Sequence, residues 1–114
     1  EAAIRQRALD LLHYVRIEER ADDLAKNLSY GDQRRLEIAR ALATDMKLLL
    51  LDEHSAALDP GTADKVLELT KKIVAENHLT CLMITHNMHD ALTLGNRTLM
   101  MDHGHIVLDI SGEE

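Results

Sequence analysis

The sequence is poor in several features that particular classes of protein need. Its single cysteine, Cys81, cannot form an internal disulfide, and no secretory signal opens the chain, so we expect a reducing cytoplasm. Tyr14 and Tyr30 are the only aromatic residues, which leaves little for stacking on nucleic-acid bases. No apolar run is long enough to cross a bilayer. Because a net charge of -7 also disfavours binding to phosphate backbones, we expect no nucleic-acid partner.

The composition that remains is typical of a globular protein, with 46% hydrophobic and 29% charged residues. A length of 114 residues allows one domain, or part of one, but not two independent cores. Helix and strand patterns alternate along the chain, which predicts an α/β fold with a parallel sheet. The expected elements are an amphipathic helix over residues 4–15, a helix capped by Ser29, a strand over 47–51, a helix from Asp59 and Pro60 to about Asn77, a strand over 80–85, a short helix from Asn87 to Leu94, and a hairpin turning at His103 and Gly104.

Two of these elements carry specific expectations. The strand over residues 47–51 shows no alternation of apolar and polar residues, which suits a strand covered on both faces. Strand, helix and strand in succession imply a right-handed parallel unit, and the C-terminal hairpin is expected at the edge of the same sheet.

Adjacent acids, Asp52 and Glu53, directly follow the leucine-rich strand. In open α/β sheets, ligands bind outside the carboxyl ends of the strands. One acid there can hold Mg²⁺ through water, and its neighbour can orient or deprotonate a water that attacks a phosphate. The simpler alternative is a pair of acids in a solvated loop.

The stretch from Leu28 to Gln33 reads "LSYGDQ" and opens a helix. A serine and a glycine at a helix start offer a hydroxyl and backbone N–H groups to an anion such as a phosphate, although the same residues also make an ordinary helix cap. His86 with His89, and His103 with His105, are close enough in sequence to suggest zinc, but both pairs lack further ligands.

Four ordered motifs make the sequence resemble the ATP-binding cassette ATPases over almost its whole length. "LSYGDQRRLEIARAL" is similar to the signature helix of that family, "LLLLDE" to its Walker B strand, "SAALD" to its D-loop and "ITHNM" to its switch-histidine loop. The resemblance implies a P-loop NTPase-like fold: a partial parallel sheet flanked by helices, with a C-terminal antiparallel hairpin. Residues 1–45 would be part of the helical subdomain with the signature helix, and residues 46–114 part of the catalytic core.

The resemblance also implies site residues and cofactors. The cofactors would be ATP and Mg²⁺, with Asp52 at the Mg²⁺ site, Glu53 as the catalytic base and His86 sensing the γ-phosphate. The remaining residues would act on ATP bound mainly by the opposite subunit of a dimer or couple the two sites, and they are Ser29, Gly31, Gln33 and Asp59.

The sequence departs from the family pattern at several positions. Tyr30 replaces the first glycine of the usual signature, and His54 and Ser55 stand where Pro-Thr or Ala-Thr is usual. No G-x-x-x-x-G-K-[ST] phosphate loop occurs, so the sequence resembles the C-terminal half of a cassette, and we predict that this chain alone does not hydrolyse ATP. The missing N-terminal half would be a partner.

The leading hypothesis is an ATPase subunit that powers solute transport, dimeric, cytoplasmic, and peripheral on the inner face of the membrane through permease subunits. One alternative is the C-terminal lobe of a DNA-repair or chromosome-maintenance ATPase. Such lobes follow a long coiled coil, whereas the residues before Asn27 show no sustained heptads. Another alternative is a non-catalytic half-cassette that pairs with a complete one.

Overall fold

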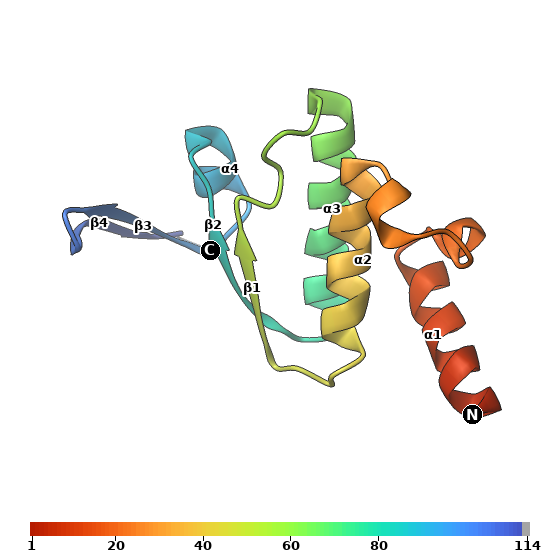
Figure 1. The fold of residues 1–114 in the computed structure, drawn as a ribbon. Coiled ribbons are helices and arrows are strands. Elements are labelled where there is room, and N and C mark those ends of the chain that lie inside the picture. The colour runs from red at the N-terminus through yellow and green to blue at the C-terminus, as the bar shows by residue number, and fades with distance from the viewer. Residues whose placement is uncertain (113–114) are drawn as a thin grey trace.

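The protein is an α/β assembly in which helices pack against a short parallel sheet and a hairpin extends from the opposite side (Figure 1). The computed structural model describes residues 1–112, so residues 113–114 of the expected catalytic-core portion lie outside the described residues. The elements are α1 (Ala2–Tyr14), 3₁₀ turns at Glu18–Arg20 and Ala25–Asn27, α2 (Tyr30–Leu42), β1 (Leu48–Asp52), α3 (Pro60–Glu76), β2 (Thr80–Ile84), α4 (Met88–Thr93), β3 (Arg97–Asp102) and β4 (His105–Ser111).

Helices α2, α3 and α4 each begin at the capping residue that the sequence predicts. A side-chain oxygen accepts a hydrogen bond from a backbone N–H three residues later, which satisfies one of the free donors of the first turn. The acceptor and donor pairs are Ser29 Oγ with Asp32 N at 3.2 Å, Asp59 Oδ2 with Thr62 N at 3.0 Å, and Asn87 Oδ1 with Asp90 N at 3.2 Å.

β1 and β2 pair in parallel, in register from Leu48 with Thr80 to Asp52 with Ile84. Leu49 and Leu51 are buried, whereas Leu48 and Leu50 are 59% and 60% exposed. The expectation that both faces of this strand are covered is therefore wrong within residues 1–112. The reason is that α2 and α3 lie side by side on one side of the strands, while on the other side the short helix α4 packs against β3 and leaves Leu48 and Leu50 exposed (Figure 1).

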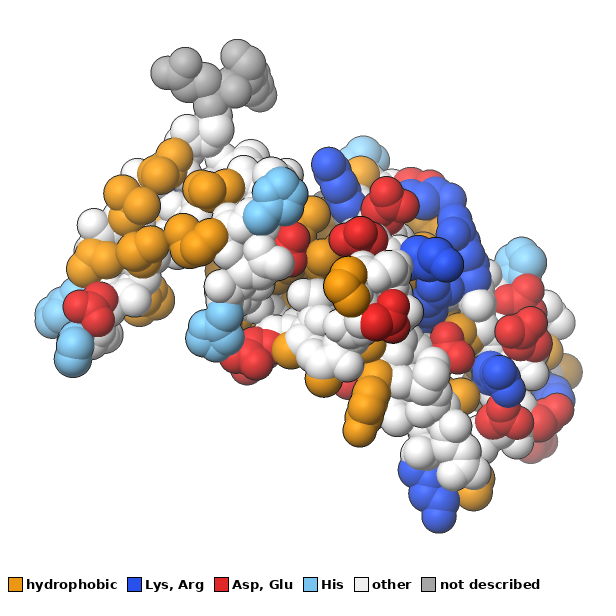
Figure 2. All heavy atoms as spheres, turned by 90° about the horizontal axis from the view of Figure 1, so that it is seen from above, with side chains coloured by type: hydrophobic (Ala, Val, Ile, Leu, Met, Phe, Trp, Pro, Cys, Tyr) orange, Lys and Arg blue, Asp and Glu red, His pale blue; other side chains and the backbone are white. Residues whose placement is uncertain are grey.

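β3 and β4 form an antiparallel hairpin, as expected, with a register irregularity between Met100 and Met101. The hairpin is a separate two-stranded sheet, so its expected place at the edge of the parallel sheet is wrong for the described residues. The physical reason is that β3 and β4 complete their ladder with each other, and α4 carries the chain away from β2 before β3 begins. Figure 2 shows hydrophobic side chains gathered on the hairpin.

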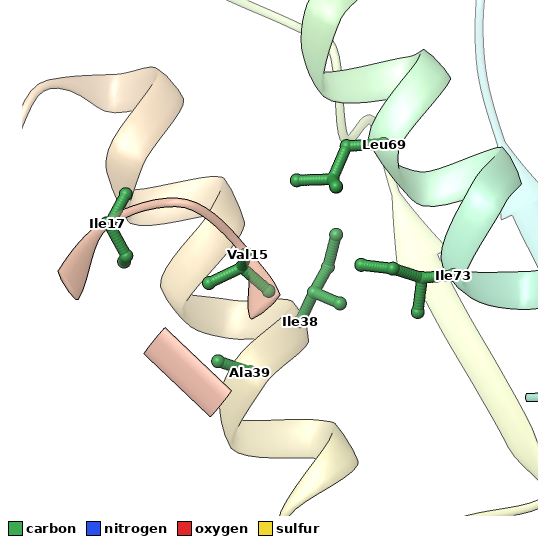
Figure 3. Packing of buried hydrophobic residues seen from close by; sticks show 6 residues of the cluster. All are labelled: Val15, Ile17, Ile38, Ala39, Leu69 and Ile73. Atoms are coloured by element: carbon green, nitrogen blue, oxygen red, sulfur yellow. The ribbon is translucent and has the colours of Figure 1, made fainter. Parts of the chain in front are cut away.

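The main hydrophobic core lies among the three longer helices and the turn that follows α1 (Figure 3). Burial of each large aliphatic side chain contributes about 1.5–3 kcal/mol relative to full exposure. The expected buried stripe on the first helix is only partly present, because Val15 is buried just after α1 whereas Ile4 is 76% exposed. The core cluster consists of Val15, Ile17, Ile38, Ala39, Leu69 and Ile73.

Within residues 1–112, no helix combines the length and the hydrophobicity needed to cross a membrane.

Candidate active site

The carboxyl ends of β1 and β2 bring Glu53 and His86 together, the pair that sequence analysis assigns to catalysis. Glu53 follows the last residue of β1, and its backbone N–H donates to the carbonyl oxygen of Ile84 at 2.9 Å. His86 follows β2 after one intervening residue, Thr85. His86 Nε2 lies 2.6 Å from Glu53 Oε1, so the imidazole and the carboxylate are in direct contact.

This contact lies at the surface, beside a hollow of about 220 Å³. The His86 side chain is 87% exposed and that of Glu53 is 45% exposed, so the pair contributes little to stability. A carboxylate has about four acceptor positions, and contact with His86 at one oxygen leaves others for a water. The geometry therefore suits a carboxylate base that lies beside an imidazole. The hollow is lined by Glu53, Ser55, Ala56, Thr85, His86 and Asn87.

The loop that carries Glu53 has an unusual backbone conformation. Glu53 has φ of 47° and Ala57 has φ of 64°, in the left-handed region that non-glycine residues rarely adopt. Each such residue costs roughly 1–3 kcal/mol and persists only where the surroundings hold it. Local bonds supply part of that hold, including one from the Ala56 N–H to the Glu53 carbonyl oxygen at 2.9 Å.

Asp52 is the last residue of β1 and is exposed. Among residues 1–112, no lysine, arginine or histidine forms an ion pair with its carboxylate. Exposed carboxylate oxygens that no cation neutralises are a suitable donor for Mg²⁺, which prefers one or two carboxylates and several waters. Asp52, with Glu53 beside it, therefore fits the expected metal site.

Residues at the start of α2 form a second group, and none of them lines the hollow beside Glu53. Ser29 is exposed, and its Oγ accepts the capping bond, which leaves the hydroxyl hydrogen available for another acceptor. The Gln33 side chain donates from Nε2 to the carbonyl oxygen of Leu28 at 3.0 Å. Gly31 is buried where α2 meets α3, and a Cβ on it would lie only 2.7 Å from Thr62 Cγ2.

Asp59 caps α3 and likewise lies outside the lining of the hollow. Hydrogen bonds from the side chain and the backbone N–H of Thr62 lower the pKa of the Asp59 carboxyl, so it is held in its charged form. The described structure thus joins Glu53 and His86 in one place, and leaves Ser29, Gly31 and Asp59 outside it.

His54 is a residue to which sequence reasoning gave no role. It is 3% exposed, and its Nε2 lies 3.3 Å from Thr70 Oγ1 on α3. Burial lowers the pKa of His54, Arg34 on α2 lowers it further, and Glu37 partly opposes this. The only signal in the sequence is that the family to which it is similar usually has Pro or Ala at this position.

Comparison with known proteins identifies a matching family model and similar sequences. The ABC transporter family model matches residues 1–56. The tyrosine transport ATP-binding protein of Clostridioides difficile (strain R20291) is 43% identical over 107 residues, which are 94% of this chain and 40% of that protein. The methionine import ATP-binding protein MetN 1 of Rhodopseudomonas palustris (strain ATCC BAA-98 / CGA009) is 44% identical over 109 residues, covering 96% of this chain and 29% of that protein.

Solved structures give the same result for the fold. A nucleotide-free ATP-binding cassette from an ABC transporter superposes with a TM-score of 0.90 at 27% identity, over 99% of this chain and 44% of that one. The chain is similar to the ATP-binding cassettes of ABC transporters. A dimeric cassette in a post-hydrolysis state with ADP and Pi has a TM-score of 0.80 at 34% identity, over 96% of this chain and 47% of that one. This chain therefore corresponds to one portion of a cassette, less than half the length of these relatives.

Proposed function

We propose that this chain is the signature and Walker B portion of an ATPase that powers the transport of a small solute across a membrane. The observation that carries the proposal is the 2.6 Å contact between Glu53 and His86 at the ends of adjacent parallel strands. The relatives named above are a tyrosine transport and a methionine import protein, which supports a transporter of amino acids rather than a DNA-repair ATPase.

In the proposed mechanism, Glu53 accepts the proton of the water that attacks the γ-phosphate of ATP. His86 contacts the Glu53 carboxylate and restricts its direction, and it also lines the hollow, where it would sense the γ-phosphate. Asp52 would hold Mg²⁺ through water. When bound, Mg²⁺ neutralises the charge that develops on the phosphate oxygens.

The start of α2 acts, in this proposal, on ATP held by the opposite subunit. This is supported by the fact that Ser29, Gly31 and Gln33 do not line the hollow beside Glu53. Ser29 would contribute its free hydroxyl hydrogen, and Gly31 and Gln33 the backbone of the first turn, while Asp59 would couple the two sites. The partners are then a second nucleotide-binding subunit, the phosphate-loop half of the cassette, and membrane permease subunits that hold it at the cytoplasmic face.

The proposal is tested by phosphate release from the complete cassette, in which this chain is joined to its phosphate-loop half. We expect Mg²⁺-dependent turnover that is lost on chelation. Glu53→Gln should lower turnover by at least about 100-fold while ATP binding remains, because the amide keeps the shape of the side chain but does not act as a base. Undiminished turnover in Glu53→Gln, or turnover by residues 1–114 alone, contradicts the proposed role.

A further inference from the structure

His54 joins the loop of the proposed catalytic base to helix α3. It follows Glu53 directly in the chain, and within residues 53–58 it is the one residue that is fully buried. Its ring nitrogen Nε2 lies 3.3 Å from Thr70 Oγ1, and Thr70 is itself 2% exposed. The contact is therefore shielded from water, where a hydrogen bond is stronger and a missing partner costs more than at the surface.

The direction of this hydrogen bond follows from counting hydrogens. Thr70 Oγ1 has a single hydrogen, which it donates to the carbonyl oxygen of Val66 at 2.8 Å. Toward His54 the Thr70 hydroxyl is thus an acceptor, and His54 Nε2 must carry the hydrogen. The structure consequently fixes one tautomer of His54, with the hydrogen on Nε2.

Burial first, and the Arg34 guanidinium second, lower the pKa of His54 and favour its neutral ring. Arg34 and Glu37, both on α2, are the charged groups that act on it, and on α3 it meets the uncharged Thr70. A second positive charge on the ring would be buried beside the Arg34 guanidinium, which Glu37 only partly offsets. The ring is therefore a neutral donor that connects the loop to α3 and lies next to α2.

We propose that His54 is a positioning residue for ATP hydrolysis: its buried ring fastens the loop that carries Glu53 to Thr70, and so keeps the Glu53 carboxylate beside His86. The left-handed backbone of Glu53 needs such an anchor, because a non-glycine residue leaves this conformation when its surroundings relax. The proposal rests on the function proposed above, in which Glu53 is the catalytic base.

The test compares variants that keep or remove the donor and the acceptor in the complete cassette. His54→Leu removes the donor and keeps an apolar side chain, whereas His54→Gln keeps an N–H near the position of Nε2. Thr70→Val removes the acceptor at equal size, and Thr70→Ser keeps it. The matched control is Thr44→Val, since the Thr44 hydroxyl also donates to a backbone carbonyl, that of Ala41 at 2.7 Å, but is exposed and distant in the chain.

We expect His54→Leu and Thr70→Val to lower kcat by about 10- to 100-fold with little change in KM for ATP, because small misplacement of a catalytic group has this effect. His54→Gln, Thr70→Ser and Thr44→Val should stay within about threefold of wild type. A purely space-filling role predicts the opposite ranking for His54, with Leu better tolerated than Gln. The inference is overturned if His54→Leu keeps wild-type kcat, or if Gln is as poor as Leu.

A second measurement is independent of activity. In ¹⁵N-histidine NMR spectra of the wild-type protein, His54 should show the neutral tautomer with hydrogen on Nε2. The tautomer with hydrogen on Nδ1 overturns the inference. If His54→Leu does not fold, this spectrum and the comparison of Thr70→Val with Thr70→Ser test the inference instead. Turnover that is lost in Glu53→Gln but normal in both His54→Leu and Thr70→Val refutes the positioning role alone. Wild-type protein without turnover refutes the proposed function and, with it, this role.

Discussion

Gly31 shows how a single hydrogen in place of a side chain decides the packing of two helices. In an exposed helix, replacing glycine by alanine stabilises the helix by about 1 kcal/mol. Here an added Cβ would lie 2.7 Å from Thr62 Cγ2, closer than real contacts allow. We therefore predict that Gly31→Ala destabilises the complete cassette by about 1–3 kcal/mol, measured by denaturant unfolding.

The matched control is Gly61→Ala, near the start of α3. A Cβ on Gly61 would lie 3.6 Å from Asp59 Oδ2, an ordinary contact, so this change should be neutral or stabilising. Adding Thr62→Ser to Gly31→Ala removes the Cγ2 methyl and should restore much of the lost stability. Equal stability of Gly31→Ala and wild type would show that α2 and α3 are not in close contact at this point.

The pH dependence of stability should report the burial of His54. Its pKa is lowered by burial and by Arg34 below the ordinary value of 6.5, so the unfolded chain binds more protons than the folded one just below pH 6.5. The contribution of His54 to stability is thus fully present above that pH and decreases as the pH falls through the folded-state pKa. We predict that the free energy of unfolding falls more between pH 7 and pH 5 in wild type than in His54→Gln. Identical slopes in denaturant titrations would contradict this.

At the scale of residues, the acids were predictable and the buried histidine was not. Asp52 and Glu53 follow an apolar strand, and the chemistry of strand ends makes them candidates from sequence alone. His54 lies in the same loop, but its burial depends on Thr70 and Arg34, which are far away in the sequence and come near only in the folded chain. No local periodicity indicates such contacts.

At the scale of the helix, substitutions of the capping residue Ser29 can test its role in stability and its role in catalysis separately. Ser29→Asp keeps a side-chain acceptor at the helix start and adds a negative charge that the helix dipole favours. Ser29→Ala removes the acceptor and should cost about 1 kcal/mol of stability. If Ser29 faces the γ-phosphate of the opposite subunit, the charge of Ser29→Asp repels it, and we predict turnover reduced by more than about 100-fold in a fully stable protein.

The comparison is made by measuring unfolding and phosphate release on the same preparations. Ser29→Ala is the control for stability, because it weakens the helix start without adding charge. Normal turnover in Ser29→Asp would show that this helix start does not meet a phosphate.

Features that depend on neighbouring residues, such as helix caps, were predicted better than strand pairing and burial, which depend on distant parts of the chain. Ser29, Asp59 and Asn87 each cap a helix as expected, because a cap needs only a few neighbouring residues. The place of the C-terminal hairpin was wrong, since which strand pairs with which is decided by distant parts of the chain. The continuous apolar run of β1 likewise indicated burial on both faces, whereas helices of the described residues cover one.

At the scale of the whole molecule, the uncovered face of the parallel sheet should govern the solution behaviour of this chain by itself. Leu50 and Leu82 are register partners, 60% and 53% exposed, and Leu48 and Ile84 extend the same apolar face. Exposed faces of this kind promote association. We predict that residues 1–114 produced alone self-associate at micromolar concentration, and that Leu50→Lys with Leu82→Glu reduces the association without unfolding the chain, as measured by sedimentation and circular dichroism.

The control for added charge is Ala2→Lys with Ala3→Glu, which places the same charges on the exposed helix α1. This variant should self-associate as wild type does. A monomeric wild-type chain, or equal association of both double variants, would show that the leucine face is not the cause.

Thr62 contacts both the loop before α3 and the first turn of α2, which limits the relative movement of these two segments. Its backbone N–H binds the Asp59 carboxylate at 3.0 Å, and its methyl group fills the space that Gly31 leaves open on α2. Neither the loop before α3 nor the first turn of α2 can shift by much against the other without breaking that fit, because close-packed groups resist small displacements. We therefore expect a displacement of Asp59 to shift the first turn of α2, and with it Ser29, through the contacts of Thr62.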